Sequence, residues 1–226
     1  MLTVEPRVAV VGIGGAGCNV VNDIYWADGS IDTIAINTDK DSLRRTKADR
    51  KVCLCKDVTK GEGAKGDTAL AERCAKAHID EIRDALKDHD TVFVIAGMGG
   101  GTGTGVAPVV IDMANSLNMI TFMIALKPFS FESQRIRAAK EGISKITARC
   151  PMTVVIENDN ILRDLPNATM NDAFLAVNRS VVKFIAEKKM RISEAMAAQL
   201  EDIGTMMAER NEPCSIPVFA DDGADA

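Results

Sequence analysis

Two clusters of glycine, each directly after a short apolar run, constrain the fold of this chain more than any other feature of its sequence. Four glycines fall in residues 12–17 after the run RVAVV, and six fall in residues 97–105 after the run TVFVIA. Short runs rich in Val and Ile and bounded by Gly are typical of buried parallel strands. A backbone without Cβ atoms can approach an anion closely, and a helix N-terminus offers it free N–H groups. The clusters therefore predict two strand-to-helix turns that can bind phosphate.

Further apolar runs extend this pattern along the chain. We expect strands at 33–37, 51–55, 119–126 and 152–157, separated mostly by helices at 68–87, 104–117 and 133–149. Strands that alternate with helices predict an α/β fold, with a Rossmann-like parallel sheet flanked by helices and joined by right-handed crossovers.

The last part of the chain is predicted to form two separate helices. Residues 171–190 carry apolar side chains on more than one side, which indicates a long central helix buried from several directions. Residues 192–211 form a second, amphipathic pattern, whose apolar stripe is Ile192, Met196, Leu200, Ile203 and Met207. This C-terminal helix either covers the exposed side of the central helix or forms an interface with another chain.

Charge separates the same two parts of the chain. The net charge is -5, and residues 191–226 hold eight acidic and only two basic side chains. We therefore divide the chain into a domain at 1–190 and a C-terminal helix with an acidic tail at 191–226. The acidic balance gives no electrostatic reason to expect nucleic acid as a partner.

Composition excludes several other classes of protein. No apolar run approaches the roughly 20 residues that span a bilayer, and the N-terminus leads directly into a strand, so we expect neither membrane insertion nor a signal peptide. Only two His are present, which excludes a His-rich metal site, and the six Cys form no CxxC pair. We expect reduced thiols in a cytoplasmic protein.

The first glycine cluster leaves two kinds of phosphate ligand open. Gly12, Gly14 and Gly17 satisfy G-x-G-x-x-G, the pattern of a dinucleotide-binding domain, and Asp39 lies where such a domain places its ribose-binding acid. The second cluster, GGGTGTG at 99–105, adds a denser loop with hydroxyl donors on Thr102 and Thr104. Two such loops favour a nucleoside triphosphate, so a NAD-dependent oxidoreductase remains only a remote alternative.

The loop GGGTGTG resembles the glycine-rich loop of the tubulin and FtsZ superfamily, and the other motifs follow in the family's order. They are GIGGAGCN (12–19), INTD (36–39), GEGAKGD (61–67), KPFSFE (127–132), IEND (156–159) and DAFLAVN (172–178). The resemblance covers about residues 7–190 and is closer to FtsZ than to tubulin. It implies the FtsZ-type nucleotide-binding fold and GTP or GDP as ligand, with Mg²⁺.

The resemblance also implies a role for each motif. The phosphates would meet Gly14, Gly15, Ala16, Gly17, Gly99, Gly100, Gly101, Thr102, Gly103, Thr104 and Gly105, and the γ-phosphate would lie near Ala64, Lys65 and Gly66. Glu132 and Asn158 would hold the ribose, Asn19 and Asn178 would read the guanine edge, and Phe174 would pack on the base. Arg135, with Arg137 as the alternative, would lie on the ribose side, and Asp39 and Pro128 complete the set. Asp39, Asp67 and Asp159 are candidate ligands of Mg²⁺ or water.

Two of these residues also have a simpler reading. Asn19 would suit the cap of the helix that follows the first loop. Lys65 either contacts phosphate directly or is a solvated loop charge.

One motif of the family has no counterpart. FtsZ and tubulin follow the central helix with an acidic loop, N-x-D-x-A-D in FtsZ, which activates water in the neighbouring subunit's site. Here the chain reads IAEKKMRISEAMAAQLEDIG after Phe184, and the 36 residues after Met190 leave no room for the family's second domain. We expect GTP binding with slow hydrolysis, and Glu194, Glu201 and Asp202 are the candidates for a relocated acid.

Two classes of function follow from the resemblance. The first is a cytoskeletal or cell-division GTPase that self-associates head to tail around its nucleotide. The second is a GTP-dependent regulatory switch, which dimerises through the helix at 192–211 or binds a protein partner through that helix or the acidic tail.

Overall fold

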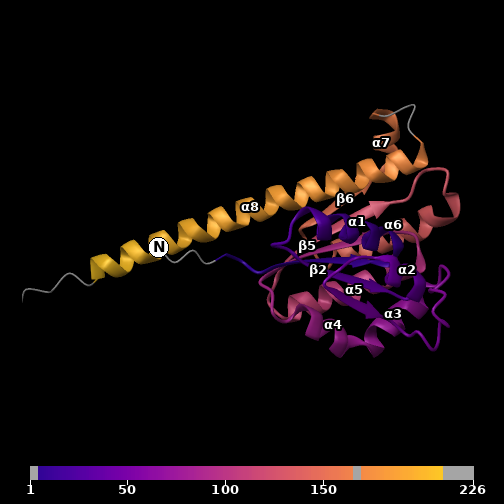
Figure 1. The fold of residues 1–226 in the computed structure, drawn as a ribbon, viewed down its shortest axis with the longest axis horizontal. Coiled ribbons are helices and arrows are strands. Elements are labelled where there is room, and N and C mark those ends of the chain that lie inside the picture. The colour runs from indigo at the N-terminus through magenta and orange to yellow at the C-terminus, as the bar shows by residue number, and fades with distance from the viewer. Residues whose placement is uncertain (1–4, 165–168, 211–226) are drawn as a thin grey trace, which may run out of the picture.

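The glycine clusters and apolar runs assemble into one parallel sheet covered on both faces by helices (Figure 1). The computed structural model describes residues 5–164 and 169–210. The strands are β1 (Val8–Ile13), β2 (Asp32–Asn37), β3 (Arg50–Cys53), β4 (Thr91–Gly97), β5 (Ile120–Lys127) and β6 (Thr153–Glu157). Their order in the sheet is β3-β2-β1-β4-β5-β6, and every neighbouring pair is parallel. The α/β fold with a Rossmann-like sheet is confirmed, and each expected strand lies within two residues of its predicted bounds.

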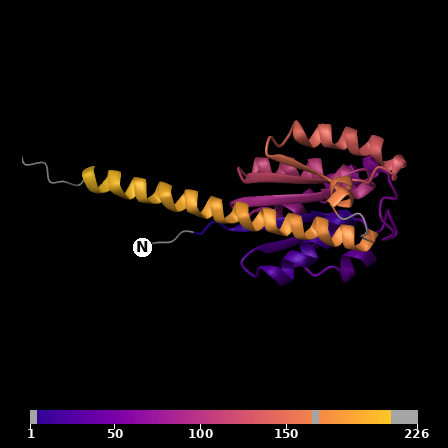
Figure 2. The same cartoon turned by 90° about the horizontal axis from the view of Figure 1, so that it is seen from above.

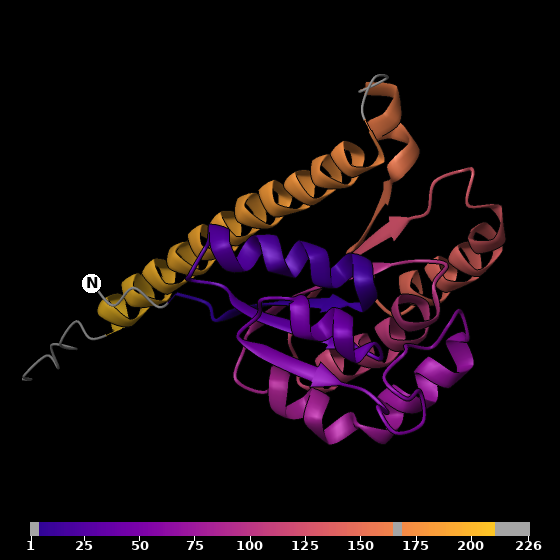
Figure 3. The same ribbon diagram turned by 45° about the vertical axis from the view of Figure 1, so that its right-hand side comes forward.

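The helices complete two layers. They are α1 (Gly14–Ala27), α2 (Lys40–Arg45), α3 (Thr68–Ala77), α4 (Ile79–Leu86), α5 (Gly101–Ser116), α6 (Ser133–Thr147), α7 (Asn158–Asp164) and α8 (Met170–Arg210). The alternation of side chains along β1 shows how the sheet serves both layers. Val11 and Ile13 pack in the core shared with α3, α4, α5 and α6, whereas Val8 and Val10 pack in the core shared with α1 and α8. Figure 3 shows α1 and α8 on one side of the sheet and α3 and α5 on the other.

The helix expected at 68–87 is divided in two, because His78 leaves the helical conformation. Its backbone has φ -108° and ψ 27°. Its ring Nε2 accepts a hydrogen bond from the N–H of Cys55 at 3.0 Å, and its Nδ1 lies 2.7 Å from Glu81 Oε1. This tertiary contact separates α3 from α4, which apolar spacing alone did not predict.

The two helices expected at 171–190 and 192–211 form one continuous helix instead. α8 has 41 residues, and at 1.5 Å per residue it is about 60 Å long. Figures 1 and 2 show its C-terminal half extending away from the body. The expectation that residues 192–211 cover the central helix is therefore wrong, because they prolong it. Since α8 crosses residue 190 unbroken, the division into 1–190 and 191–226 stays a prediction based on charge.

The side chains of α8 are buried where the helix lies on the sheet and become exposed where it extends away from the body. Ala173, Val177, Val181 and Ile185 are buried against the sheet, and Ile192 still packs against the edge of that core. Farther along, Leu200 is 42% exposed and Ile203 is 52% exposed. The side chain of Met207 and the acidic tail from Pro213 lie outside the described residues. Within the described residues, no helix combines the length and apolarity needed to cross a membrane.

Candidate functional site

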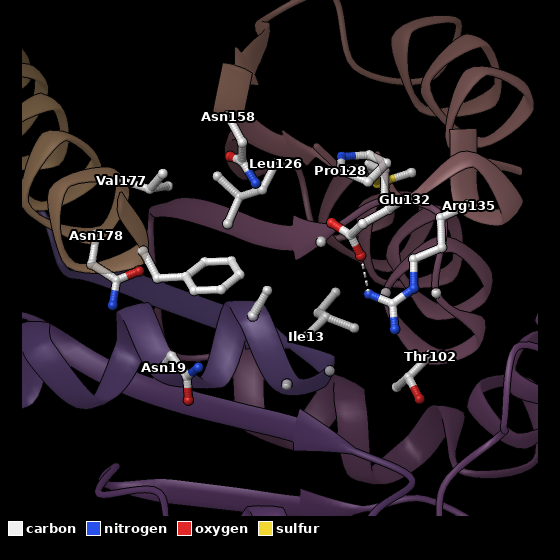
Figure 4. A pocket seen from close by; sticks show the side chains of 18 of the residues that line it. Ile13, Asn19, Thr102, Leu126, Pro128, Glu132, Arg135, Asn158, Val177 and Asn178 are labelled. Carbon is white, nitrogen blue, oxygen red and sulfur yellow. Dashed lines mark hydrogen bonds and ion pairs between the residues drawn. The ribbon is translucent and has the colours of Figure 1, made fainter. Parts of the chain in front are cut away.

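A pocket of about 590 Å³ opens where the carboxyl ends of β1, β4 and β5 meet the first turn of α5 and the side of α8. β1 and β4 are the neighbours at which the chain changes direction across the sheet. Ligands of open parallel sheets bind in the crevice at this kind of position. Figure 4 shows side chains from β5, α6, α8 and the loops around this pocket.

The first glycine cluster turns the chain from β1 into α1 and leaves part of its backbone open to the pocket. Gly14 has φ 69°, and a Cβ atom at Gly12 or Gly17 would overlap backbone carbonyl groups of the turn and of Ile95. A Cβ atom at Gly15 would meet no heavy atom within 4 Å. The turn therefore needs Gly12, Gly14 and Gly17 for its own packing, whereas Gly15 faces open space in the pocket.

The second glycine cluster turns the chain from β4 into α5. Gly99 has φ 92°, and a Cβ atom at Gly103 would overlap the carbonyl of Gly97. Thr104 Oγ1 accepts a hydrogen bond from the N–H of Gly99 at 2.8 Å, so this hydroxyl braces the loop. Thr102 lines the pocket, and its Oγ1 lies 2.7 Å from Thr38 Oγ1.

Both helices that begin at the pocket have open N-termini. α1 and α5 have no side-chain cap, and neither has an acidic residue in its first turn. The first four N–H groups of a helix lack partners within the helix, and they carry the positive end of its dipole. Two such ends at one pocket produce a site for an anion with several negative oxygens.

The loop at 61–66 contacts the start of α5 but does not line the pocket. The N–H of Ala64 donates to Thr38 Oγ1 at 3.0 Å, and a Cβ atom at Gly101 would lie 3.0 Å from Ala64 Cβ. Lys65 has φ 46° and forms an exposed ion pair with Glu62. Ala64, Lys65 and Gly66 are therefore held beside the pocket rather than in its wall.

Of the two arginines predicted for the ribose side, one lines the pocket and the other does not. Arg135 lines the pocket, and its Nη1 lies 2.8 Å from Glu132 Oε2. Glu132 also accepts a hydrogen bond from the N–H of Phe129 at 3.1 Å. Arg137 does not line the pocket, because it pairs with Glu141 on the exposed side of α6.

Asn158 lines this pocket and, within the described part of the chain, carries a buried polar atom without a partner. The residue is only 7% exposed, and its Oδ1 has no hydrogen-bond partner among the described residues. A buried acceptor without a partner costs roughly 1–3 kcal/mol. A ligand that donates a hydrogen bond to this oxygen would remove that cost.

Side chains of α1 and α8 form the far end of the pocket. Phe174 is 47% exposed and packs edge-on against Phe129, with ring centroids 5.5 Å apart. Asn178 Nδ2 donates to Asp23 Oδ2 at 2.8 Å. Asn19 lines the pocket one turn before Asp23, and Figure 4 shows Asn19 and Asn178 at the same end of the pocket.

The structure brings most of the predicted residues together and adds others. In the pocket wall are Gly14, Gly15, Ala16, Asn19, Gly100, Gly101, Thr102, Gly103, Pro128, Glu132, Arg135, Asn158, Phe174 and Asn178. Outside the wall are Gly17, Asp39, Ala64, Lys65, Gly66, Gly99, Thr104 and Gly105. Sequence reasoning missed Asn22, Asp23, Met98, Asn171 and Leu175. Asn22 and Asp23 could have been found from helical spacing, since they lie three and four residues after Asn19.

The candidate acids for hydrolysis lie far from this pocket. Glu194, Glu201 and Asp202 are exposed on the part of α8 that leaves the body. Glu194 follows Asn178 by 16 residues, which is about 24 Å along a helix. Among the described residues, only Asp23 and Glu132 bring carboxylates into the pocket wall.

The residues considered for Mg²⁺ have other partners. Carboxylate oxygens of Asp39, Asp67 and Asp159 accept hydrogen bonds from the N–H groups of Ser42, Leu70 and Ser130 respectively, at 2.8–3.0 Å. The described part of the chain contains no group of three or more His, Cys, Asp or Glu that could hold a metal ion. These residues therefore do not form a metal cage of their own.

The chain is similar in sequence to known proteins. The family model "Tubulin/FtsZ family, GTPase domain" matches residues 7–166. Cell division protein FtsZ 2 of Halobacterium salinarum is 41% identical over 194 residues, which cover 85% of this chain and 48% of that protein. The chain thus spans about half the length of the curated relatives it matches.

Solved structures give the same result for the fold. An FtsZ dimer of M. jannaschii superposes with a TM-score of 0.75 at 36% identity, over 80% of this chain and 53% of that one. CetZ1 of Haloferax volcanii, described as a GDP-bound monomer, superposes with a TM-score of 0.71 at 24% identity, over 78% of this chain and 58% of that one.

Proposed function

The chain belongs to the tubulin/FtsZ family of GTPase domains, and on that premise we propose that it binds GTP and GDP in the pocket at the ends of β1 and β4. The observation that carries this proposal is the convergence of α1 and α5, whose uncapped N-termini meet at one pocket. Their N–H groups would hold the phosphates. Asn158 Oδ1 would then accept a hydrogen bond from a ribose hydroxyl, and Phe174 would pack against the base.

A competition experiment tests this proposal against the dinucleotide alternative. Asp39, on which that alternative depended, caps α2 and does not line the pocket. We expect fluorescent GDP bound to the protein to be displaced by GTP and GDP but not by NAD. Displacement by NAD alone would overturn the proposal.

We further propose that this chain hydrolyses GTP slowly. Phosphoryl transfer depends on positioned groups that orient water and stabilise charge, and their loss costs orders of magnitude in rate. Neither carboxylate in the pocket wall replaces the family's acidic loop, because Glu132 is paired with Arg135 and Asp23 lies at the far end. The residues 185–203 that follow the central helix motif continue as helix. Mg²⁺ would arrive with the nucleotide rather than in a protein cage, and no step here depends on it.

Single-turnover and steady-state assays with GTP test the rate. We expect slow turnover that does not change when Glu194, Glu201 and Asp202 are replaced by Ala. Fast turnover that is lost on those replacements would instead support a relocated acid acting on a neighbouring subunit. Fast turnover insensitive to them would contradict the proposed effect of the missing loop.

Nucleotide-dependent self-association in the cytoplasm is the function we propose for the protein as a whole. It is supported by the family, whose members include a cell division protein and a solved structure described as an FtsZ dimer. Cys18, Cys53, Cys55, Cys74 and Cys150 are free thiols, as in a reducing compartment. Electron microscopy and sedimentation with GTP separate the two modes. Filaments would support a cytoskeletal or cell-division role, whereas a discrete dimer would support the regulatory switch, which binds its partner through the exposed end of α8 or the acidic tail.

A further inference from the structure

One carboxylate at the far end of the pocket has no role among the functions described so far. Asp23 lies on α1 and lines the pocket, and its Oδ2 accepts a hydrogen bond from Asn178 Nδ2 at 2.8 Å. In the described part of the chain, Asp23 makes no ion pair and no second side-chain hydrogen bond. A carboxylate has about four acceptor sites, so Asp23 retains several of them for a ligand.

The position of Asp23 along α1 places it at the base rather than at the phosphates. The N-terminus of α1 at Gly14 is the proposed phosphate end of the pocket. Asp23 follows it by nine residues, which is about 13 Å along the helix. Ala16, Asn19 and Asp23 succeed one another at helical spacing on the pocket side of α1. The pocket therefore runs along α1 from the phosphates to Asp23.

The hydrogen bond between Asp23 and Asn178 also changes the role of Asn178. One N–H of its NH₂ group donates to Asp23, which leaves the second N–H and the amide oxygen. Asn178 lies on α8, and it holds the carboxylate of α1 in place across the pocket. Asn178 is therefore a positioning residue for Asp23.

The hydrogen-bonding pattern of purines identifies what this carboxylate would bind. Guanine presents two donors side by side, N1–H and N2–H₂, which match the two oxygens of a carboxylate. Adenine presents an acceptor at N1 instead, and a carboxylate facing it would lose its hydrogen bonds to water without replacement. Xanthine carries an acceptor in place of the 2-amino group. It therefore cannot donate to the carboxylate oxygen that N2–H₂ of guanine would meet.

We propose that Asp23 determines the guanine specificity of this pocket, by accepting hydrogen bonds from N1–H and N2–H₂ of the base. The inference rests on the proposed function, since it assumes that a purine nucleotide binds here. The amides of Asn19 and Asn22, which also line the pocket on α1, supply donors for the acceptor atoms of the base.

Replacing Asp23 by Asn tests the inference, because an amide offers one acceptor and one donor where the carboxylate offers two acceptors. The wild-type protein should bind GDP about tenfold more tightly than IDP, which lacks the 2-amino group, and show little binding of XDP or ADP. Asp23→Asn should weaken GDP binding by about 10- to 100-fold, as expected for lost hydrogen bonds to a charged group. The same variant should bind XDP more tightly than GDP. Titration calorimetry with the four diphosphates measures these affinities.

Asp28→Asn is the matched control. Asp28 also joins α1 to α8, through Lys189 Nζ at 3.2 Å, but it does not line the pocket. This variant should keep the nucleotide preference of the wild type. If Asp23→Asn keeps wild-type GDP affinity and gains none for XDP, the inference about Asp23 is overturned while nucleotide binding stands. If the wild type binds none of the four nucleotides, the proposed function itself fails, and the inference fails with it.

Discussion

A methyl group at Gly17 would overlap the carbonyl oxygen of Ile95, whereas one at Gly15 would meet no heavy atom within 4 Å. The two glycines lie in the same turn and in the same sequence motif. At the scale of the residue, the motif therefore contains one position required by packing and another available to a ligand. The difference between Gly17 and Gly15 arises from a backbone atom on β4, so the spacing of glycines in the sequence does not reveal it.

Alanine substitutions at Gly17 and Gly15 should distinguish the position that packing requires from the position that is available to a ligand. Gly17→Ala should lower the free energy of unfolding by about 1–3 kcal/mol, because the overlap forces the backbone to shift. Gly15→Ala should leave stability unchanged or raise it by up to about 1 kcal/mol through helix propensity, yet weaken nucleotide binding. Urea unfolding and GDP titration measure the two effects. Equal losses of stability in both variants would contradict the division.

At the scale of the element, α8 combines two environments in one helix. Residues up to Ile185 pack on the sheet beside α1, and among the described side chains Ile192 is the last that packs against that core. Glu194, Glu201 and Asp202 follow on exposed turns. The helix is thus a wall of the pocket at one end and an exposed rod at the other.

A chain ending at Ser193 tests whether the exposed part of α8, from Glu194 onward, contributes to the stability of the fold. Since exposed positions contribute little to stability, the free energy of unfolding should change by less than about 1 kcal/mol, and nucleotide binding should persist. Urea unfolding and light scattering are the measurements. Aggregation of the shortened chain would show that this segment covers apolar surface after all.

The contact between Asp28 and Lys189, which joins α1 to α8, makes the stability of the fold depend on pH. Burial alone would raise the pKa of the Asp28 carboxyl, but hydrogen bonds from Ser30 and the Lys189 ammonium hold that pKa below its ordinary value. A carboxyl with a lowered folded pKa stabilises the fold above its unfolded pKa, about 3.9, and this contribution disappears as the pH falls through the folded value. Asp28→Asn should remove that part of the pH dependence. Unfolding measured between pH 3 and pH 7 in both proteins provides the comparison, and identical profiles would refute it.

At the scale of the whole molecule, the sheet places all the loops of the pocket at one edge and leaves apolar surface elsewhere. Val154 and Val155 on the edge strand β6 are 37% and 39% exposed, and Leu200 and Ile203 on α8 are also exposed. Val154 and Val155 are consecutive in the strand, so their side chains point to opposite faces of the sheet. We propose that these exposed side chains contact another protein or a second copy of the chain.

Nucleotide binding should appear as a change in the stability of the whole molecule. A ligand at 100 times its dissociation constant stabilises the fold by about 2.7 kcal/mol, and for a domain of this size each kcal/mol raises the melting temperature by about 2–4 °C. We expect GDP and GTP to raise the melting temperature by roughly 5–10 °C. NAD should not. Calorimetry measures the shift, and an equal shift with NAD would contradict a site specific for guanine nucleotides.

Much of the fold and of the glycine-lined part of the pocket was predictable because both depend on local sequence. Buried strands are apolar over a few consecutive residues, and a strand-to-helix turn needs glycine at particular positions. The sequence left a choice between Arg135 and Arg137 for the arginine of the pocket. Both lie near the start of α6, and packing of the first turn against Gly99 places Arg135 in the pocket.

The sequence alone therefore determined the α/β class, the two glycine turns at the ends of strands and the family to which they belong. The tertiary structure decided three other features. It joined two predicted helices into α8, it divided the helix at His78, and it brought Asp23 within 2.8 Å of Asn178. Asp23 and Asn178 are 155 residues apart in the chain. Local patterns report the conformation of neighbouring residues, whereas a contact between distant residues exists only once the helices that carry them have packed on the same sheet.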